Sequence, residues 1–417
     1  MNPISPPLTA PALSGSLANG NSFHLADWAQ GMKRSVLREM IAVVSQPGIL
    51  SFAGGLPAPE LFPTAAYAQA AAQVLASDPA VLQYGPPLAA LKGHIVQLMA
   101  RRGVSCSEEQ IFLTTGAQQA LDILTRLLVN PCGQVVLEEL VYTGIQQVLA
   151  PLGADILTVP TDLETGLEAD ALADQLAAGA RPAYLYTIPQ GHNPLGVSLS
   201  PAKRERLIEL AHRYRLPILE DDPYGFLSYD GDAPPPLKAL DGQWVFYIGS
   251  FSKILAPALR LGWIVAPEAL ISRLTVVKEA NDLESSAFTQ RAVAAFLDAG
   301  HLPGHLATLR REYGRRRDVM LAAMARSFPP GLRWTRPSGG MFIWVELPAG
   351  VDTAALLQVA IAQEQVAFIP GHAFAVHQSG PQQQHARRCL RLNFSNCQPA
   401  KIEEGIARLG RVIGAAV

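Results

Sequence analysis

Short apolar runs alternate with segments of helical periodicity through the middle of the chain. Apolar residues recur at helical spacing between 120 and 128, and Ser200 followed by Pro201 is a pair typical of a helix start. The apolar runs lie at 111–114, 135–137, 156–159, 183–188, 216–219 and 244–248. Strands that are apolar throughout and separated by helices are typical of a mostly parallel sheet covered on both faces. The pattern therefore predicts an α/β fold whose large domain has three layers, α/β/α.

Polar residues follow the ends of several of these runs. Thr115 and Gly116 come directly after the first run, and Asn193 comes soon after the run at 183–188. Asp221 and Ser250 stand in the same position after the next two runs. In parallel sheets the carboxyl ends of the strands share one edge, and ligands bind there. The sequence therefore predicts a functional site at this edge.

The pattern changes after about residue 308. Two strand-like runs, at 339–345 and 390–394, follow a charged helical segment, which indicates a second, smaller α+β domain. Five arginines lie on that helical segment, and a solvated helix face explains them better than a binding role does. They are Arg310, Arg311, Arg315, Arg316 and Arg317.

Composition and charge exclude several classes of protein. The chain has 417 residues, of which 49% are hydrophobic and 16% charged, so disorder is not its main state. The net charge of -2 offers no excess of cations for nucleic acid, and no apolar run is long enough to predict a membrane span. The four cysteines match no common zinc spacing, so we expect no metal. They also form no disulfide framework, and the amino-terminal segment does not resemble a signal peptide. We therefore expect a cytoplasmic location.

Three residues at the predicted edge have side chains suited to amine chemistry. Lys253 follows a buried strand, where desolvation would lower its pKa and free the amine for a Schiff base. Asp221 could hold a pyridinium nitrogen protonated, which lets a pyridoxal ring withdraw electrons. Asn193 could donate to a phenolate oxygen. Taken singly, each has a plainer explanation: a surface lysine, a helix cap or loop acid, and a turn residue.

A phosphate site is the second candidate feature. Gly116, Ala117 and Gln118 begin a helix after a strand, where free backbone N–H groups and the helix dipole favour a phosphate. Ser250, Ser252 and Arg260 could complete the site, although such helix starts are also common without a ligand.

Taken together, in this order and at these separations, the motifs resemble the fold-type I pyridoxal-phosphate aminotransferases of classes I and II. The carrying motifs are Asn-Pro-Leu-Gly at 193–196, Glu-Asp-Asp-Pro-Tyr-Gly at 220–225, Ser-Phe-Ser-Lys at 250–253 and Arg-Leu-Gly-Trp at 260–263. Further matches lie at 338–344, 369–374 and 391–394, and the segment 48–63 is similar to the 2-aminoadipate aminotransferase branch. The resemblance spans roughly residues 35–410.

The resemblance implies roles for individual residues. Lys253 would hold pyridoxal 5'-phosphate and carry the proton between the α-carbon and the cofactor carbon. Asp221 would pair with the pyridine nitrogen, and Tyr224 with Asn193 would bind the ring oxygen. The expected catalytic residues are Lys253, Asp221 and Tyr224. Tyr142 would stack on the ring. Gly116, Ala117, Gln118, Ser250, Ser252 and Arg260 would hold the phosphate, and Tyr84 would reach the phosphate of the neighbouring subunit, which implies a homodimer.

The resemblance also implies the substrate contacts. Arg391 would bind the α-carboxylate as a bidentate fork, with Asn193 and Gly55 beside it. Arg38, on a segment expected to form a short helix, stands where similar 2-aminoadipate enzymes carry a substrate-sensing arginine. A surface arginine paired with a nearby acid is an equally good interpretation of Arg38.

Three departures from the family pattern stand near the site. The segment after Tyr84 is shorter than usual and lacks the glycine that the family usually places about four or five residues after this position, which bears on the role of Tyr84 and on the dimer contacts. His192 stands where glutamine is usual, and Ala258 where glycine is usual.

The resemblance implies four segments. They are a flexible amino-terminal arm at 1–30, a small-domain segment and substrate gate at 31–60, a large cofactor-binding domain at 61–308 and a small domain at 309–417.

We therefore expect an aminotransferase that moves the amino group of an L-α-amino acid, of 2-aminoadipate, aromatic or branched-chain type, to 2-oxoglutarate by a ping-pong mechanism. Two alternatives stay open at this point. One is a decarboxylase, lyase or cyclising synthase on the same scaffold, and the other is a non-enzymatic sensor with an aminotransferase-like domain.

Overall fold

A seven-stranded sheet forms the centre of the larger part of the molecule. The computed structural model describes residues 26–30 and 48–417. The strand order is β2-β10-β9-β8-β7-β3-β4, and every neighbouring pair is parallel except the two that β10 makes. The predicted α/β class with a mostly parallel sheet is thereby confirmed. The strands are β2 (Ile111–Thr114), β3 (Gln134–Glu138), β4 (Asp155–Val159), β7 (Leu185–Thr187), β8 (Ile218–Asp221), β9 (Val245–Ser250) and β10 (Gly262–Val265).

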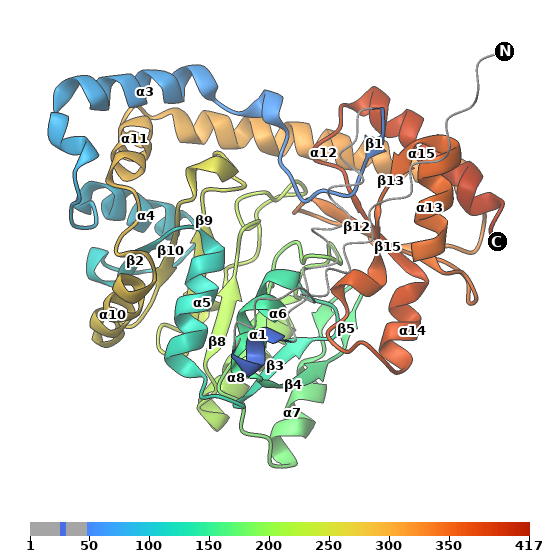
Figure 1. Ribbon diagram of the computed structural model, residues 1–417, viewed down its shortest axis with the longest axis horizontal. Coiled ribbons are helices and arrows are strands. Elements are labelled where there is room, and N and C mark those ends of the chain that lie inside the picture. The colour runs from blue at the N-terminus through green and yellow to red at the C-terminus, as the bar shows by residue number, and fades with distance from the viewer. Residues whose placement is uncertain (1–25, 31–47) are drawn as a thin grey trace, which may run out of the picture.

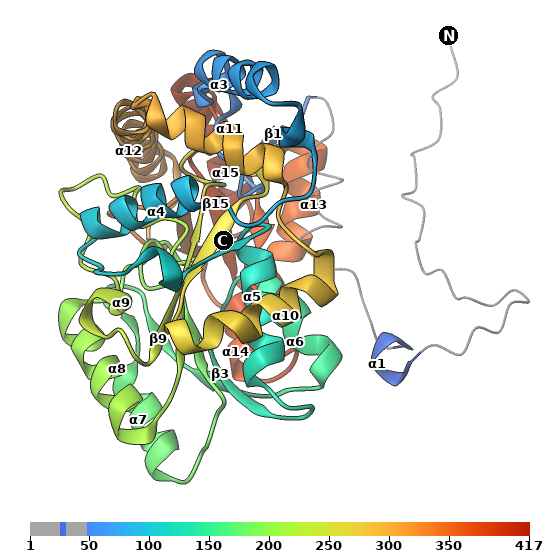
Figure 2. The same ribbon diagram turned by 90° about the vertical axis from the view of Figure 1, so that its left-hand side faces the viewer.

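Helices cover both faces of this sheet (Figure 2). On one side lie α7 (Ala169–Ala177), α8 (Pro201–Tyr214) and α9 (Leu237–Leu240); on the other lie α5 (Ala117–Leu128), α6 (Thr143–Leu149) and α10 (Ile271–Asp282). Successive residues of one strand serve different cores, because Val135 packs in the larger apolar cluster and Val136 in the smaller one. As predicted, Ser200 caps α8, since its side chain accepts from the backbone N–H of Lys203.

A second, antiparallel sheet lies on the right of Figure 1. Its order is β11-β12-β15-β14, from Arg333–Trp334, Phe342–Glu346, Cys389–Asn393 and Ile369–Pro370. It packs with α13 (Thr353–Glu364), α14 (Pro381–Arg387) and α15 (Pro399–Gly414). Near it, β1 (Leu50–Ser51) pairs in parallel with β13 (Val366–Ala367), so the chain around residue 50 lies beside this sheet.

The helix α12 (His301–Ser327) runs along the top of Figure 1 from α11 (Ala287–Asp298) towards α15. The predicted limit at residue 308 falls inside this continuous helix, and the four predicted segments stay predictions. The remaining elements are α1 (Asp27–Gln30), α3 (Thr64–Ser77), α4 (Ala89–Arg101), β5 (Thr161–Asp162) and β6 (Gly166–Leu167).

The solvated-face interpretation of the arginines on α12 is wrong for two of them. Arg316 and Arg317 are buried. Arg316 bonds to Glu60, Glu312 and the carbonyl of Ser395. Arg317 contacts Asp230 and donates to the carbonyl of Pro337. These two guanidinium groups tie α12 to the chain on both sides of it, and their partners are too distant in sequence for periodicity to find.

The four cysteines are unpaired, as predicted, and the cytoplasmic location stays a prediction. Among the helices that the structure describes, none combines the length and the apolar character needed to span a bilayer.

Candidate active site

The predicted polar edge of the large sheet is formed by strands of both directions. Gly262, the first residue of β10, pairs with Thr114 at the end of β2 and with Ser250 at the end of β9. Because β10 runs antiparallel to its neighbours, the residues just before it lie at the same edge as the residues just after β2 and β9. This topology brings Arg260 to the amino end of α5.

A cluster of donors surrounds that helix end. Gly116 caps α5 with a φ of +82°, and Arg260 donates through Nη2 to the carbonyl oxygen of Thr115 at 3.2 Å. A Cβ at Gly116 would lie 2.8 Å from that Nη2, so only glycine allows this approach. Nearby, the backbone N–H of Ser252 donates to Ser250 Oγ at 3.1 Å. The N–H groups that begin α5 at Ala117, together with the guanidinium of Arg260, form an arrangement suited to a phosphate.

Tyr142 lies at the start of α6 against Gln118. Its hydroxyl donates to Gln118 Oε1 at 3.0 Å, and Gln118 Nε2 donates to the carbonyl oxygen of Gly144 at 3.0 Å. A Cβ at Gly144 would fall 2.2 Å from the Tyr142 ring. Glycine at 144 therefore lets the Tyr142 ring fold back beside the amino end of α5.

Asp221 ends β8 as a buried carboxyl group with one open acceptor. Tyr186 donates its hydroxyl to Oδ2 at 3.0 Å, whereas Oδ1 is buried and has no hydrogen-bond partner among the described residues. Burial raises the pKa of Asp221 to about 7; the charge of Asp222 adds to the rise and the Tyr186 hydrogen bond opposes it. A buried carboxylate with a free oxygen is the acceptor that a protonated ring nitrogen requires.

The neighbouring Asp222 already has a cationic partner. Arg102 Nη2 and the Tyr247 hydroxyl both donate to its Oδ2, at 3.2 and 3.1 Å. The Arg102–Asp222 ion pair is almost fully buried. Of the two adjacent acids, Asp221 therefore has no cationic partner within residues 26–30 and 48–417.

Lys253 lies just beyond β9, with its amine turned to the amino-terminal segment. Its Nζ donates to the carbonyl oxygen of Gly55 at 2.8 Å. Burial lowers the pKa of Lys253 to about 8, and the charges of Arg391 and Arg260 lower it further. This is the pKa shift that an amine nucleophile needs, as expected from its place after a buried strand.

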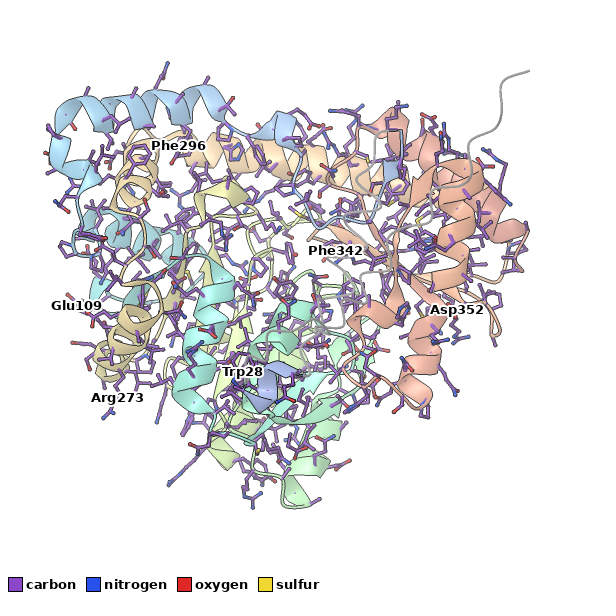
Figure 3. The ribbon with its side chains drawn as sticks, viewed as in Figure 1. Trp28, Glu109, Arg273, Phe296, Phe342 and Asp352 are labelled. Atoms are coloured by element: carbon purple, nitrogen blue, oxygen red, sulfur yellow. The ribbon has the colours of Figure 1, made fainter. Side chains whose placement is uncertain are left out.

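Arg391 is a fully buried cation on β15. Its Nη1 donates to Asn193 Oδ1 and its Nη2 to the carbonyl oxygen of Ala53, both at 2.7 Å. Its guanidinium carbon lies 4.2 Å from the ring centre of Phe342 and 4.6 Å from that of Phe374. Phe342 lies between the two parts of the molecule (Figure 3). Burial lowers the pKa of Arg391 to about 9, which still leaves it charged at neutral pH.

Asn193 and Tyr224 lie beside Arg391. The peptide bond between Asn193 and Pro194 is cis. Tyr224 is buried and packs edge-on against Phe342 with ring centres 5.9 Å apart, and burial raises its pKa well above the ordinary value. Next to Asn193, the His192 Nε2 lies 3.3 Å from a carboxylate oxygen of the buried Glu138. The histidine that departs from the family pattern thus lies beside a buried carboxylate.

One predicted site residue lies apart from this cluster, and a second cannot be placed. Tyr84 lies on the surface with 76% of its area exposed in the single chain. Arg38 falls outside the described residues. The remaining predicted residues lie at or next to the polar edge described above.

Sequence reasoning missed several groups that complete the site. Tyr186 was passed over as strand core, although it stands next to the polar end of its run. The carbonyl of Ala53 carries no signal in its side chain. Phe342 and Phe374 lie inside motifs already noted at 338–344 and 369–374, so their place beside Arg391 was open to prediction.

These groups suit pyridoxal phosphate part by part. The amino end of α5 with Arg260 suits its phosphate, the open oxygen of Asp221 its ring nitrogen, and the amine of Lys253 its aldehyde. Tyr142 and Asn193 provide the flat ring and the amide expected beside it. The residues present therefore fit this cofactor.

Comparison with known proteins agrees with this geometry. Residues 53–409 match the family described as Aminotransferase class I and II. Aromatic-amino-acid aminotransferase 1 of Thermococcus litoralis is 38% identical over 399 residues, which cover 94% of each chain. The solved kynurenine aminotransferase of Pyrococcus horikoshii, a complex with PMP, has a TM-score of 0.87 and 35% identity over 94% of this chain and 97% of its own. The α-aminoadipate aminotransferase of Thermus thermophilus, solved with N-(5'-phosphopyridoxyl)-L-leucine, has a TM-score of 0.86 and 35% identity over the same shares.

Site, fold and relatives therefore agree on one assignment. The chain belongs to the class I and II aminotransferases, and it is a pyridoxal-phosphate-dependent enzyme that transfers amino groups.

Proposed function

We propose that this enzyme transfers the amino group of an L-α-amino acid to 2-oxoglutarate in two half-reactions that share one site. The observation that carries the proposal is Arg391. It is buried, and no carboxylate pairs with it in the part of the chain that the structure describes. Its Nε also lacks a partner there. A buried cation without an anion is costly, so a carboxylate from the substrate is the natural partner.

A carboxylate on Arg391 sets the position of the substrate's α-carbon. Asn193 Oδ1 and the Ala53 carbonyl hold the guanidinium in place, and the Phe342 ring covers one of its faces. Every α-amino acid and every 2-oxo acid carries this carboxylate. The same contact therefore serves both half-reactions, which is what a ping-pong mechanism requires.

Pyridoxal phosphate supplies the aldehyde that takes up the amino group and a ring that withdraws electrons from the α-carbon. Lys253 is proposed to take the proton from the α-carbon on its Nζ and to return it on the cofactor side. Its pKa of about 8 leaves a useful share of neutral amine at neutral pH, roughly a tenth compared with less than one in a thousand for an ordinary lysine. Asp221 would keep the ring nitrogen charged, while Asn193 and Tyr224 would hydrogen-bond the ring oxygen.

A homodimer is part of the proposal. Leu82 and Tyr84 are 72% and 76% exposed, and Leu283 is 60% exposed. The backbone N–H of Gly85 donates to the Glu284 carboxylate at 3.1 Å, so the two apolar segments lie side by side. Large apolar side chains gathered in this way favour a contact with a second copy, in which Tyr84 would reach the other site.

Replacing Arg391 by alanine tests the proposed function. We expect kcat/KM to fall about 100-fold or more for the amino acid and for 2-oxoglutarate alike, because both lose a two-pronged charge-assisted contact. Arg391→Lys should recover only part of the loss, since lysine lacks the planar fork. The measurement is the initial rate of glutamate formation at varied concentrations of the amino acid and of 2-oxoglutarate.

The matched control is Arg387→Ala, which removes an exposed arginine four positions earlier that pairs with Asp352. It should leave both kcat/KM values unchanged. Normal kinetics in folded Arg391→Ala protein would place the α-carboxylate elsewhere and overturn the proposed site.

The substrate side chain is the finer part of the proposal. The relatives are named for aromatic amino acids, kynurenine and α-aminoadipate, and one was solved with a leucine adduct, which supports both dicarboxylic and bulky apolar substrates. An arginine that pairs with a distal carboxylate in one half-reaction and leaves room in the other would explain both. Arg38, predicted from the sequence, is the candidate.

Arg38→Ala is expected to raise the KM for glutamate or 2-aminoadipate about tenfold or more, the value of one charge-assisted contact. The KM for an apolar or aromatic amino acid should hardly change. Steady-state kinetics with both kinds of substrate give the answer. Equal losses for both would make Arg38 structural, and no loss would remove it from the site.

A further inference from the structure

A second cavity lies apart from the residues assigned to the reaction. Its volume is about 470 Å³, and it lies between the end of α4, the loop after Tyr224 and the beginning of α12. Its lining includes Arg101, Arg102, Asp232, Phe226, Leu306 and Arg310. None of the residues assigned above to cofactor or substrate lines it.

The lining carries an excess of positive charge. Three arginines and one aspartate line the cavity, and one of the arginines, Arg102, is already paired with Asp222. Within the described ranges, neither Arg101 nor Arg310 forms an ion pair; Arg310 donates only through Nε to the carbonyl oxygen of Phe226, at 2.8 Å. The side chain of Arg102 is 7% exposed, and its Nε is buried with no partner among the described residues. A concave surface with unpaired guanidinium groups attracts an anion.

The other walls are apolar. Phe226 and Leu306 are buried side chains of the lining, which also includes Pro235 and Pro303. The guanidinium carbon of Arg102 lies 5.8 Å from the centre of the Phe226 ring. A cavity of this volume with a few convergent polar groups is typical of small-molecule sites. A ligand that satisfies both parts of the lining carries a carboxylate on an apolar body.

We propose that this cavity is a regulatory site that binds a small organic acid, with its carboxylate on the arginines and its apolar body against Phe226 and Leu306. Arg102 connects the site with the reaction. It lines the cavity and donates to Asp222 at 3.2 Å, and Asp222 adjoins Asp221 in the chain. An anion that draws on the charge of Arg102 leaves Asp222 less compensated. The negative form of Asp221 then becomes less favourable, so the bound acid inhibits the enzyme.

Phenylacetate is a suitable probe, because it has a carboxylate and an apolar ring but no amino or keto group to react with the cofactor. The holoenzyme should bind two molecules per chain in calorimetry, one at Arg391 and one in the cavity. The double variant Arg101→Gln, Arg310→Gln should bind at the cavity at least tenfold more weakly, since each lost charge-assisted contact is worth about tenfold. It should keep normal turnover without phenylacetate, because neither residue belongs to the catalytic machinery.

The matched control is Arg311→Gln, Arg315→Gln, which removes two exposed arginines of the same helix that do not line the cavity. It should bind phenylacetate as the unchanged enzyme does. Inhibition of the unchanged enzyme should have a component that high substrate does not relieve, and this component should vanish in the Arg101, Arg310 double variant.

Three outcomes would overturn the proposal. The first is one bound phenylacetate per chain in the unchanged enzyme that is lost in Arg391→Ala, because the cavity would then bind none, and the second is identical binding in both double variants. The third is cavity binding of phenylacetamide or inorganic phosphate that is as tight as that of phenylacetate, because the site would then recognise no organic acid.

Discussion

Lys253→Ala is expected to lower turnover by several orders of magnitude while the protein still folds and binds pyridoxal phosphate. The substitution removes the amine that is proposed to hold the cofactor and to carry the α-proton. The only hydrogen bond of the Lys253 amine in the described structure is the 2.8 Å contact with the Gly55 carbonyl oxygen. The phosphate site proposed at Arg260 and the amino end of α5 does not include this amine. Affinity for the cofactor should therefore fall far less than kcat.

Lys401→Ala is the control, because Lys401 is an exposed lysine paired with Glu404 and should be dispensable. Borohydride reduction of the unchanged enzyme, followed by peptide mapping, should find the cofactor on Lys253. Recovery of the adduct on another lysine would contradict the assignment.

The same lysine predicts a pH dependence. Its pKa is lowered to about 8, and only the neutral amine attacks an aldehyde. The rate at which cofactor-free protein captures pyridoxal phosphate should therefore rise with pH up to about 8 and level off above it. A rate that keeps rising towards pH 10 would indicate an ordinary lysine.

The residues of the polar edge were predictable because local signals agreed with topology. Asp221 and Ser250 end buried apolar runs, and parallel strands bring such ends to one edge. The resemblance to a known family then assigned chemistry that the residues alone left open. Without it, Lys253 would have remained one lysine among many.

Other parts of the site depend on contacts between distant segments. Arg391 meets Asn193 and the carbonyl of Ala53, which are 198 and 338 positions away in sequence. The hydrophobic periodicity of the chain does not predict contacts between residues so far apart in sequence. Every residue has a backbone carbonyl, so the residue type at position 53 gives no information about this contact. The role of Ala53 could therefore not be predicted from the sequence.

Burial of charged groups was the least predictable property. Arg316 and Arg317 look like their exposed neighbours on α12, and only the position of Glu60 and Asp230 in space makes them buried partners. Asp221 and Asp222 are adjacent residues of the same type, and only the resemblance to a known family selected Asp221. The structure separates them because Arg102 reaches one of them and Tyr186 the other.

That separation gives the second prediction of large effect. Asp221→Asn should lower turnover by orders of magnitude, because an amide cannot keep the ring nitrogen protonated and the α-carbon loses its electron sink. Asp222→Asn should instead keep much of the chemistry but lower the thermal stability, since Arg102 is then left buried without its partner. Near-normal turnover in Asp221→Asn would indicate that Asp222, and not Asp221, keeps the ring nitrogen protonated.

The pH dependence of the stability of the cofactor-free protein tests the buried carboxylate of Asp221 independently, and the direction of the expected change is defined. The pKa of Asp221 is raised from 3.8 to about 7, so the folded state holds a proton that the unfolded state releases between these pH values. The carboxylate therefore costs no stability well below pH 3.8, progressively more as the pH rises, and its full cost above about pH 7. Asp221→Asn removes this cost, and Tyr186 can still donate to the amide oxygen. Calorimetry of the cofactor-free proteins should show that the unfolding temperature of Asp221→Asn, relative to the unchanged protein, rises from the acid side of pH 3.8 to pH 8. If the variant is less stable at pH 8, the open oxygen of Asp221 has a partner in the cofactor-free protein. The carboxylate would then be stabilised without the cofactor.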